Sequence, residues 1–312
     1  MAVTWPAGGD ATAGATGGAP GAPWPVGPAG PAGPAGPAGP AGPQPRALIV
    51  TVYGLYARQT AGWMSVASVI ELLARCGVDE PSVRSAIFRL KRRGLLLAAR
   101  PGGVAGYELS DEARVILDEG DRRIFERRRA TMADGWVLAV FSVPESHRHQ
   151  RHQLRSQLSR LGFGTVEAGV WIAPAHVLEE AQAVLARHNL DRYVELFRAS
   201  HVAFSDPAGL VARCWNLDRL SEQYQAFLAR QVPVLAAYRR RKRIDTGQAF
   251  ADYVGALTQW RRLPFLDPGL PEAALPTRWN GLRAADTFFE LRDRLTAPAA
   301  EFVAVAERQR AD

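Results

Sequence analysis

The chain has 312 residues, of which 47% are hydrophobic, and a formal net charge of +7. This length predicts two or three domains, and the hydrophobic fraction is high enough for most of the chain to bury a core. The basic balance favours a polyanionic partner such as nucleic acid or the phosphates of a coenzyme. No apolar run approaches the roughly 18 residues of a membrane span. The N-terminus lacks the pattern of a secretory signal, so a cytoplasmic protein is expected.

Cys76 and Cys214 are the only cysteines, and they lie far apart in apolar surroundings. Because no CxxC pair or zinc spacing is present, we expect two reduced, structural thiols. The sequence contains no P-loop, no GxGxxG after a strand, no HExxH and no GxSxG, and nothing nominates a nucleophile. The prediction is therefore a protein that is not an enzyme and carries no cofactor or metal.

Residues 1–45 differ in composition from the rest of the chain. Asp10 is their only charged residue, and residues 27–43 read "GPAGPAGPAGPAGPAGP". A run this short, with nothing else in the chain to suggest a trimer, favours a disordered, polyproline-II-like extension over a collagen helix. The folded part is expected to begin at Arg46.

Apolar residues then repeat at helical spacing in "RALIVTVYGLYARQ" and "SVASVIELLARCG". A third helix is predicted in "EPSVRSAIFRLKRRG", with Asp79 as its N-cap, Pro81 in its first turn and Gly94 at its end. The following "LLLAARPGGVAGYELS" predicts two short strands joined by a turn. Three helices followed by a hairpin are the order of a winged helix-turn-helix domain, which we assign to residues 46–130 together with a linker helix.

The third helix has an apolar face and a basic face. Val83, Ala86, Ile87 and Leu90 fall on one side, so the opposite side could be an ordinary solvated surface or a surface that meets DNA. The third helix of this motif enters the major groove, where arginine can bond guanine and neutralise phosphate. The order of elements favours DNA binding through six residues: Arg84, Ser85, Arg89, Arg92 and Arg93 on the helix, and Arg100 on the hairpin.

Two further basic runs are harder to interpret. "DRRIFERRRA" (residues 121–130) could follow a phosphate backbone, but a solvated linker helix with an Arg122–Glu126 pair is favoured. "RRRKR" (residues 239–243) predicts an exposed loop or helix end, and a contact with a ligand phosphate stays open.

Residues 131–205 follow the order βαββαβ, which predicts a ferredoxin-like domain. In outline this unit is similar to the small nucleases of CRISPR adaptation, which carry an acidic residue at the end of the first strand. Here Ser142 and Pro144 lie near that end and Glu145 lies beyond it. Without a placed aspartate nothing would hold a divalent metal against phosphate, so a dimerisation scaffold is favoured and a metal-dependent nuclease is the alternative.

The next helix begins with three histidines, His147, His149 and His152. No nearby carboxylate or thiolate completes a metal site, so a polar helix start is expected. Residues 206–312 are predicted to be helical, interrupted by the proline-rich connector "LPFLDPGLPEAALPTRW". The predicted fold class is thus α+β and multidomain: a winged helix-turn-helix, a ferredoxin-like domain and an α-helical C-terminal domain.

The motifs "EPSVRSAIFRLKRRG", "WVLAVFSVPE", "LSRLGFGTVEAGVWIAP" and "LPFLDPGLPEAALPTRWNG" together resemble the PaaX family of transcriptional repressors. The resemblance covers most of residues 46–295. It implies a homodimeric repressor of phenylacetate-type aromatic catabolism that binds an inverted-repeat DNA operator and is released by an aryl-CoA such as phenylacetyl-CoA. The C-terminal domain is a candidate for binding that effector. Trp171 and Trp279 lie in matching motifs and are expected to be core aromatics.

Overall fold

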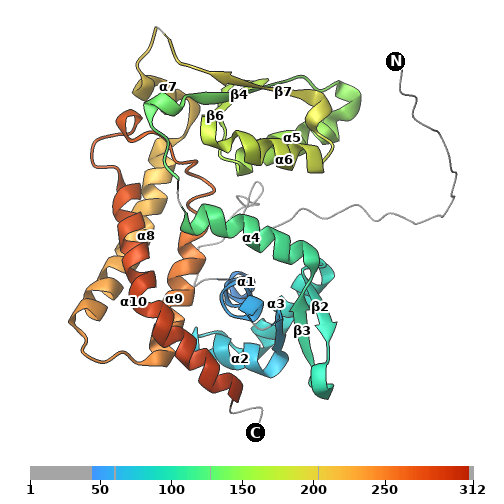
Figure 1. Cartoon of the computed structure of the whole chain (residues 1–312), viewed down its shortest axis with the longest axis vertical. Helices are drawn as coiled ribbons and strands as arrows, with labels where there is room; N and C mark the ends of the chain where they lie inside the picture. Colours follow the sequence, from blue (N-terminus) through green and yellow to red (C-terminus); the bar gives the residue numbers. More distant parts are fainter. Residues whose placement is uncertain (1–43, 60, 127, 203, 309–312) are drawn as a thin grey trace, which may run out of the picture.

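The structure is a computed structural model that describes residues 44–308 except 60, 127 and 203. The Gly-Pro-Ala extension expected for residues 1–45 therefore lies almost wholly outside the described residues. Within the described part, the fold is α+β, with ten α-helices and two antiparallel sheets. Figure 1 shows one sheet at one end of the molecule, short helices and a hairpin at the other, and long helices along one side.

The N-terminal unit contains three helices, a three-stranded sheet and a linker helix. Its elements are α1 (Pro45–Leu55), β1 (Trp63–Ser65), α2 (Val66–Arg75), α3 (Glu80–Arg92), β2 (Leu96–Ala99), β3 (Gly106–Leu109) and α4 (Asp111–Phe125). The strand order is β1-β3-β2. The three helices and the hairpin follow the predicted order. The three-residue β1 was not predicted, because so short a segment has no detectable alternation and is a strand only through its pairing with β3.

The middle unit contains four strands and two helices. Its elements are β4 (Trp136–Phe141), α5 (Arg148–Arg160), β5 (Gly164–Glu167), β6 (Val170–Pro174), α6 (Leu178–Arg187) and β7 (Val194–Ala199). The strand order β5-β6-β4-β7 places the first and third strands at the centre, and every described pairing is antiparallel. The core between the sheet and its two helices includes the buried side chains of Leu154, Leu158 and Leu161.

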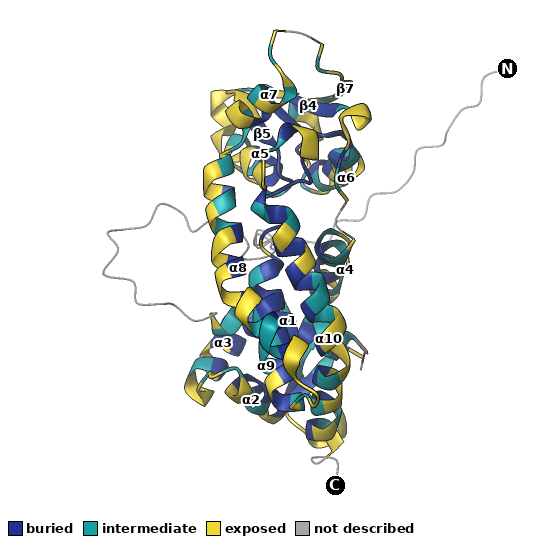
Figure 2. Ribbon diagram, turned by 90° about the vertical axis from the view of Figure 1, so that its left-hand side faces the viewer, coloured by how far each residue is buried: buried dark blue, intermediate teal, exposed yellow. Residues whose placement is uncertain are grey.

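The C-terminal part is helical and is interrupted by a long connector, as predicted. Its helices are α7 (Pro207–Cys214), α8 (Leu217–Arg240), α9 (Thr246–Trp260) and α10 (Asn280–Arg308). Residues 239–243 are exposed at the end of α8 and just beyond it, which confirms their prediction as a helix end. Figure 2 shows how α8, α9 and α10 connect the two ends of the molecule, with their buried sides facing inward.

The N-terminal unit and the C-terminal helices share one hydrophobic core, although the sequence assigned them to separate domains. Buried side chains of α1, α3, α4, α8, α9 and α10 belong to the same cluster. Trp260 on α9 is fully buried, stacks on Phe288 at 4.9 Å, and donates its indole N–H to the carbonyl of Ile124 on α4 at 3.1 Å. The hydroxyls of Thr51 and Thr258 lie 2.7 Å apart between α1 and α9. The position of α3 is therefore set by the C-terminal helices as well as by its neighbours in sequence.

Residues 267–269, which we call the joint loop, connect all three parts of the chain. The side chain of Asp267 is fully buried and accepts hydrogen bonds from the Tyr224 hydroxyl (2.8 Å) and from its own loop's Gly269 N–H (3.0 Å). Arg129, which follows α4, lies 3.8 Å from the same carboxylate. The N–H of Ala130 donates to the carbonyl of Gly269 at 2.8 Å.

The joint loop also contacts the middle unit. A Cβ added to Gly162, at the end of α5, would lie 2.7 Å from Pro268. His176, which follows β6, lies close to the backbone of Pro268. The motif "LSRLGFGTVEAGVWIAP", which contains Gly162, thus meets the motif "LPFLDPGLPEAALPTRWNG" at this loop.

At Gly269 the joint loop leaves no room for a side chain. Its φ is +75°, and a Cβ there would lie 2.2 Å from the carbonyl oxygen of Arg128. We expect Gly269→Ala to lower the free energy of unfolding by about 1–3 kcal/mol, since it combines left-handed strain with a backbone clash.

Urea denaturation followed by circular dichroism measures this change. Gly255→Ala is the matched control, because this glycine lies inside α9 with open space around its Cβ position. Replacing a helical glycine by alanine should stabilise the protein by about 0.5–1 kcal/mol. Equal unfolding free energies for the two variants would contradict the role assigned to the joint loop.

Candidate nucleic-acid interface

Helix α3 has the ends and the buried face that the sequence predicted. Asp79 is its N-cap and accepts a hydrogen bond from the Ser82 N–H at 2.9 Å. Gly94 follows the helix with a φ of +70°, a conformation that glycine adopts without strain. The side chains that hold the helix against the core are those expected, namely Val83, Ala86, Ile87 and Leu90.

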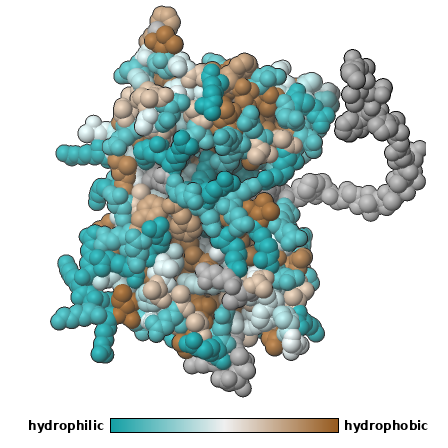
Figure 3. All heavy atoms as spheres, viewed as in Figure 1, coloured by the Kyte–Doolittle hydropathy of each residue, from teal (hydrophilic) through white to brown (hydrophobic). Residues whose placement is uncertain are grey.

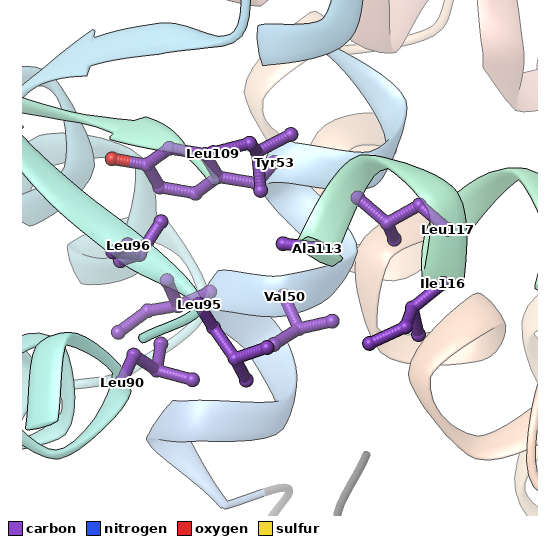
Figure 4. Close-up of a pocket in the computed structure, with 10 residues that line it drawn as sticks. Val50, Tyr53, Leu90, Leu95, Leu96, Leu109, Ala113, Ile116 and Leu117 are labelled. Atoms are coloured by element: carbon purple, nitrogen blue, oxygen red, sulfur yellow. The ribbon is translucent and has the colours of Figure 1, made fainter. Parts of the chain in front are cut away.

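Figure 4 shows how apolar side chains from α1, α3, the hairpin and α4 face one another beneath this helix. The space that they enclose is only about 20 Å³, less than a drug-sized ligand needs. This region is therefore packed core that fixes α3 relative to the hairpin and to α4.

The opposite side of α3 is exposed and basic. All six residues that the sequence nominated for DNA are exposed: Arg84, Ser85, Arg89, Arg92 and Arg93 on or directly after α3, and Arg100 at the end of β2. Lys91 is also exposed, and the Phe88 ring is 58% exposed. Of these basic residues, Arg84 forms an ion pair within the described part of the chain, with Glu80 at 2.7 Å. Both partners are more than half exposed, so the pair contributes at most about 1 kcal/mol and can open readily.

Arg46 adds a cation to this surface that sequence reasoning did not nominate. It lies in the first turn of α1, and its pKa is lowered by partial burial and then by the nearby charges of Arg93 and Arg89. This lowering of the Arg46 pKa indicates that the charges of Arg89 and Arg93 lie near its guanidinium. In the sequence, the one signal that could have nominated Arg46 was that it is the first charged residue of the folded part and comes directly before an apolar run.

The basic segment 121–130 has a role that neither interpretation of the sequence anticipated. Arg123 donates to the carbonyls of Arg160 (3.1 Å) and Leu161 (2.6 Å) at the end of α5, and burial lowers its pKa. Arg129 donates to the carbonyl of Leu270 at 2.8 Å. The favoured hypothesis of a solvated linker helix is therefore wrong for these two arginines, which connect α4 to the rest of the molecule. The predicted Arg122–Glu126 pair is not among the ion pairs of the described residues.

The end of β4 offers little for metal chemistry. Ser142 and Pro144 are exposed there, and Glu145 is bound by Arg151 at 2.7 Å. The three histidines of the following helix start are exposed, as expected of a polar helix start. Among the residues that the structure describes, no group of three histidine, cysteine or acidic side chains is placed to hold a metal ion. Nothing at this strand end favours the nuclease alternative.

The cysteines and the two motif tryptophans are structural. Cys76 and Cys214 are half-buried free thiols, and burial raises the pKa of Cys76 to about 12. A thiol with so high a pKa stays protonated and is a poor nucleophile. Trp171 and Trp279 are buried, which confirms their prediction as core aromatics.

Comparison with known proteins is consistent with this arrangement. Three family descriptions match the chain in order: "PaaX-like protein" at residues 44–113, "PaaX protein central Cas2-like domain" at residues 129–211, and "PaaX-like protein C-terminal domain" at residues 215–305. The transcriptional repressor PaaX of Escherichia coli (strain K12) is 26% identical over 261 residues, which are 82% of each chain.

A solved structure has a similar fold. Rv0674, an uncharacterised protein from Mycobacterium tuberculosis, aligns with a TM-score of 0.55 and 23% identity over 83% of this chain and 97% of its own. At this identity the likeness concerns the fold alone.

The molecule combines an exposed basic helix on a rigid core with a Cas2-like unit and a helical unit. This combination defines a multidomain DNA-binding regulator of transcription. The chain belongs to the PaaX family of transcriptional repressors. The described residues contain no helix long and apolar enough to cross a membrane.

The Arg46 position leads to a testable expectation. Because its guanidinium lies beside Arg89 and Arg93 in the first turn of α1, it should neutralise phosphate rather than read bases. We expect Arg46→Ala to weaken binding to all duplexes alike and to reduce the slope of log affinity against log salt by about 1.

Fluorescence anisotropy with a selected operator and a random duplex, at several salt concentrations, measures both quantities. Arg155→Ala is the control, since this exposed arginine lies on α5 at the far end of the molecule from α3 (Figure 1). An unchanged salt slope in Arg46→Ala would exclude the phosphate contact.

Proposed function

We propose that the protein is a homodimeric repressor of aromatic, phenylacetate-type catabolic genes, and that an aryl-CoA thioester releases it from DNA. In this proposal the N-terminal unit acts as a winged helix and α3 enters the major groove of each half of an inverted repeat. The observation that carries the proposal is the exposed row of arginines on α3, which a shared core holds at a fixed place in the molecule.

The two ends of α3 would have different tasks. In helices of this type the N-terminal part contacts base edges, which here means Arg84 and Ser85. Arg89 lies one turn beyond Ser85 on the same face and would reach the next bases. Arginine can form two hydrogen bonds with guanine, whereas serine accepts or donates to several bases. Arg92 and Arg93 at the C-terminal end, with Arg46 beside Arg93, would contact phosphates and supply much of the sequence-independent affinity.

The homodimer would form through the middle unit, whose sheet has one incompletely covered face. Leu138 on β4 lies directly opposite Phe197 on β7, so both side chains point to the face that is not covered by α5 and α6. Phe197 is 50% exposed and Val140, two residues along β4, is also exposed. Beyond β7, the side chains of Val202 and Phe204 are almost fully exposed. Large apolar side chains gathered in this way are typical of interaction sites.

Release by an effector would follow from the geometry of such a dimer. Two recognition helices can bind one face of a duplex only when their separation matches successive turns of the major groove. An effector that binds better to a dimer with another separation would shift the population away from the DNA-bound form.

The recognition helix can be tested by one substitution. We expect Arg89→Ala to weaken operator binding by about 1–3 kcal/mol and to relax the preference for one base pair in each half-site. The operator is first selected from random duplexes, in which an inverted repeat should be enriched. Arg155→Ala serves again as the control, and an Arg89→Ala variant with wild-type affinity and base preference would refute the assignment of α3.

The dimer surface can be tested independently of DNA. Phe197→Asp would place a charge in an apolar interface, so we expect sedimentation equilibrium to show monomers at concentrations where the wild type is dimeric. Val232→Asp on α8 is the matched control, because Val232 is a similarly exposed apolar residue in another unit. A Phe197→Asp protein that stays dimeric would exclude this face as the interface.

A further inference from the structure

Phe88 is an aromatic residue in the middle of α3, and its side chain is 58% exposed. Figure 3 shows hydrophobic side chains interspersed among hydrophilic ones over the face viewed there, so one exposed apolar residue is by itself ordinary. Phe88 differs because the exposed side of its helix is otherwise basic. Its arginine neighbours can bind phosphate or guanine, and an apolar ring can do neither.

The ring lies in the row of α3 side chains that faces away from the core. Phe88 follows Arg84 by four positions and precedes Arg92 by four, so these three side chains follow one another along the helix. The opposite side of the helix carries its buried residues, namely Val83, Ala86, Ile87 and Leu90. Whatever the arginines of this row meet, the ring of Phe88 therefore meets as well.

The ring of Phe88 contributes little to the fold. It does not belong to the apolar side chains of the described residues that pack against the shared core. Within the same part of the chain, it stacks on no other ring and lies beneath no cation. Phenylalanine is also a weaker helix former than alanine, so a solvated helix position gains no stability from it. The stability of the folded chain therefore does not explain this side chain.

An apolar ring between cations fits a partner that presents negative charge and apolar groups side by side. A second copy of this chain does not fit, because it would bring the same arginines against these, and like charges repel. The major groove of DNA fits, because phosphates line its edges and each thymine presents a C5-methyl group within it. Phenylalanine is one of the side chains that can pack against this methyl group.

We propose that Phe88 recognises a thymine in each half of the operator by packing its ring against the C5-methyl group. Arg84 lies one turn before Phe88 and Arg92 one turn after it, so the contact falls between the bases bound by the N-terminal part of α3 and the phosphates bound by its C-terminal end. The inference rests on the proposed function, since it requires α3 to enter the major groove. It adds a base preference that involves no hydrogen bond.

The burial of one methyl group sets the size of this preference. Removing a methyl group from water against an apolar ring changes the affinity by about fourfold. An operator with two half-sites contains two such contacts, so the loss of both methyl groups should weaken binding by about tenfold. The contact involves no charge. The ratio of the two affinities should therefore stay the same when salt weakens the phosphate contacts.

Deoxyuridine isolates the contact, because it lacks the methyl group of thymine and keeps its hydrogen-bonding groups. Each thymine of the selected operator is replaced in turn, at the equivalent position of both half-sites, and fluorescence anisotropy measures the affinity of the full-length chain. We expect at least one thymine position at which this replacement weakens binding by about tenfold. The same ratio is expected at low and at high salt.

Substitutions of Phe88 show whether its ring makes the contact. Phe88→Ala should bind the thymine and the deoxyuridine operators with equal affinity, whereas Phe88→Leu keeps an apolar side chain and should retain part of the preference. Val115→Ala is the matched control, because it shortens a similarly exposed apolar side chain on α4, and it should keep the full ratio. Circular dichroism and thermal unfolding show whether each variant is folded.

The outcomes distinguish this inference from the proposed function. A wild-type chain that binds its selected operator but responds to no deoxyuridine, or whose half-sites contain no thymine, would overturn the inference and leave the DNA-binding function standing. A folded Phe88→Ala variant that still prefers thymine would also overturn it, since another residue or the stiffness of the DNA would then cause the preference. A wild-type chain that enriches no duplex would overturn both proposals.

Discussion

The buried carboxylate of Asp267 is the interaction on which the arrangement of the three parts depends. It receives hydrogen bonds from α8 and from its own loop, and an arginine that follows α4 compensates its charge. A buried carboxylate without these partners would cost several kcal/mol, so the chain cannot separate α4, α8 and the joint loop without a large loss of stability. The loop also fits against the end of α5, where Gly162 leaves room for Pro268. One short segment thereby positions the sheet unit relative to both other parts.

A second constraint acts through the shared core around Trp260. Because α1 and α4 pack on α9 and α10, the exposed face of α3 is presented by most of the molecule rather than by a small independent domain. A regulator with this construction cannot release DNA by letting its recognition unit swing freely. The recognition unit and the C-terminal helices therefore have to move together.

The elements of the fold were largely predictable, because each is specified by short-range signals. The cap of α3 by Asp79, its end at Gly94 and its buried face at Val83, Ile87 and Leu90 all follow from local chemistry and helical periodicity. The three-residue β1 was missed, since a segment so short is a strand only through its pairing with β3. The candidate DNA surface was predicted for α3 itself but not for Arg46, which joins it only because α1 and α3 pack together.

By itself, the sequence determined the order of helices and strands, the basic face of α3 and the motifs that mark the family, since these depend on residues close together in the chain. Only the tertiary structure decided which charges remain available. Arg123 and Arg129 belong to the same basic run as Arg122 and Arg128, yet the first two bond carbonyls of distant segments and the other two face a cavity. The structure likewise decided that the N-terminal and C-terminal parts share a core. The physical reason is that burial and pairing depend on segments that lie 37 to 141 residues apart for these two arginines, and no local pattern records their approach.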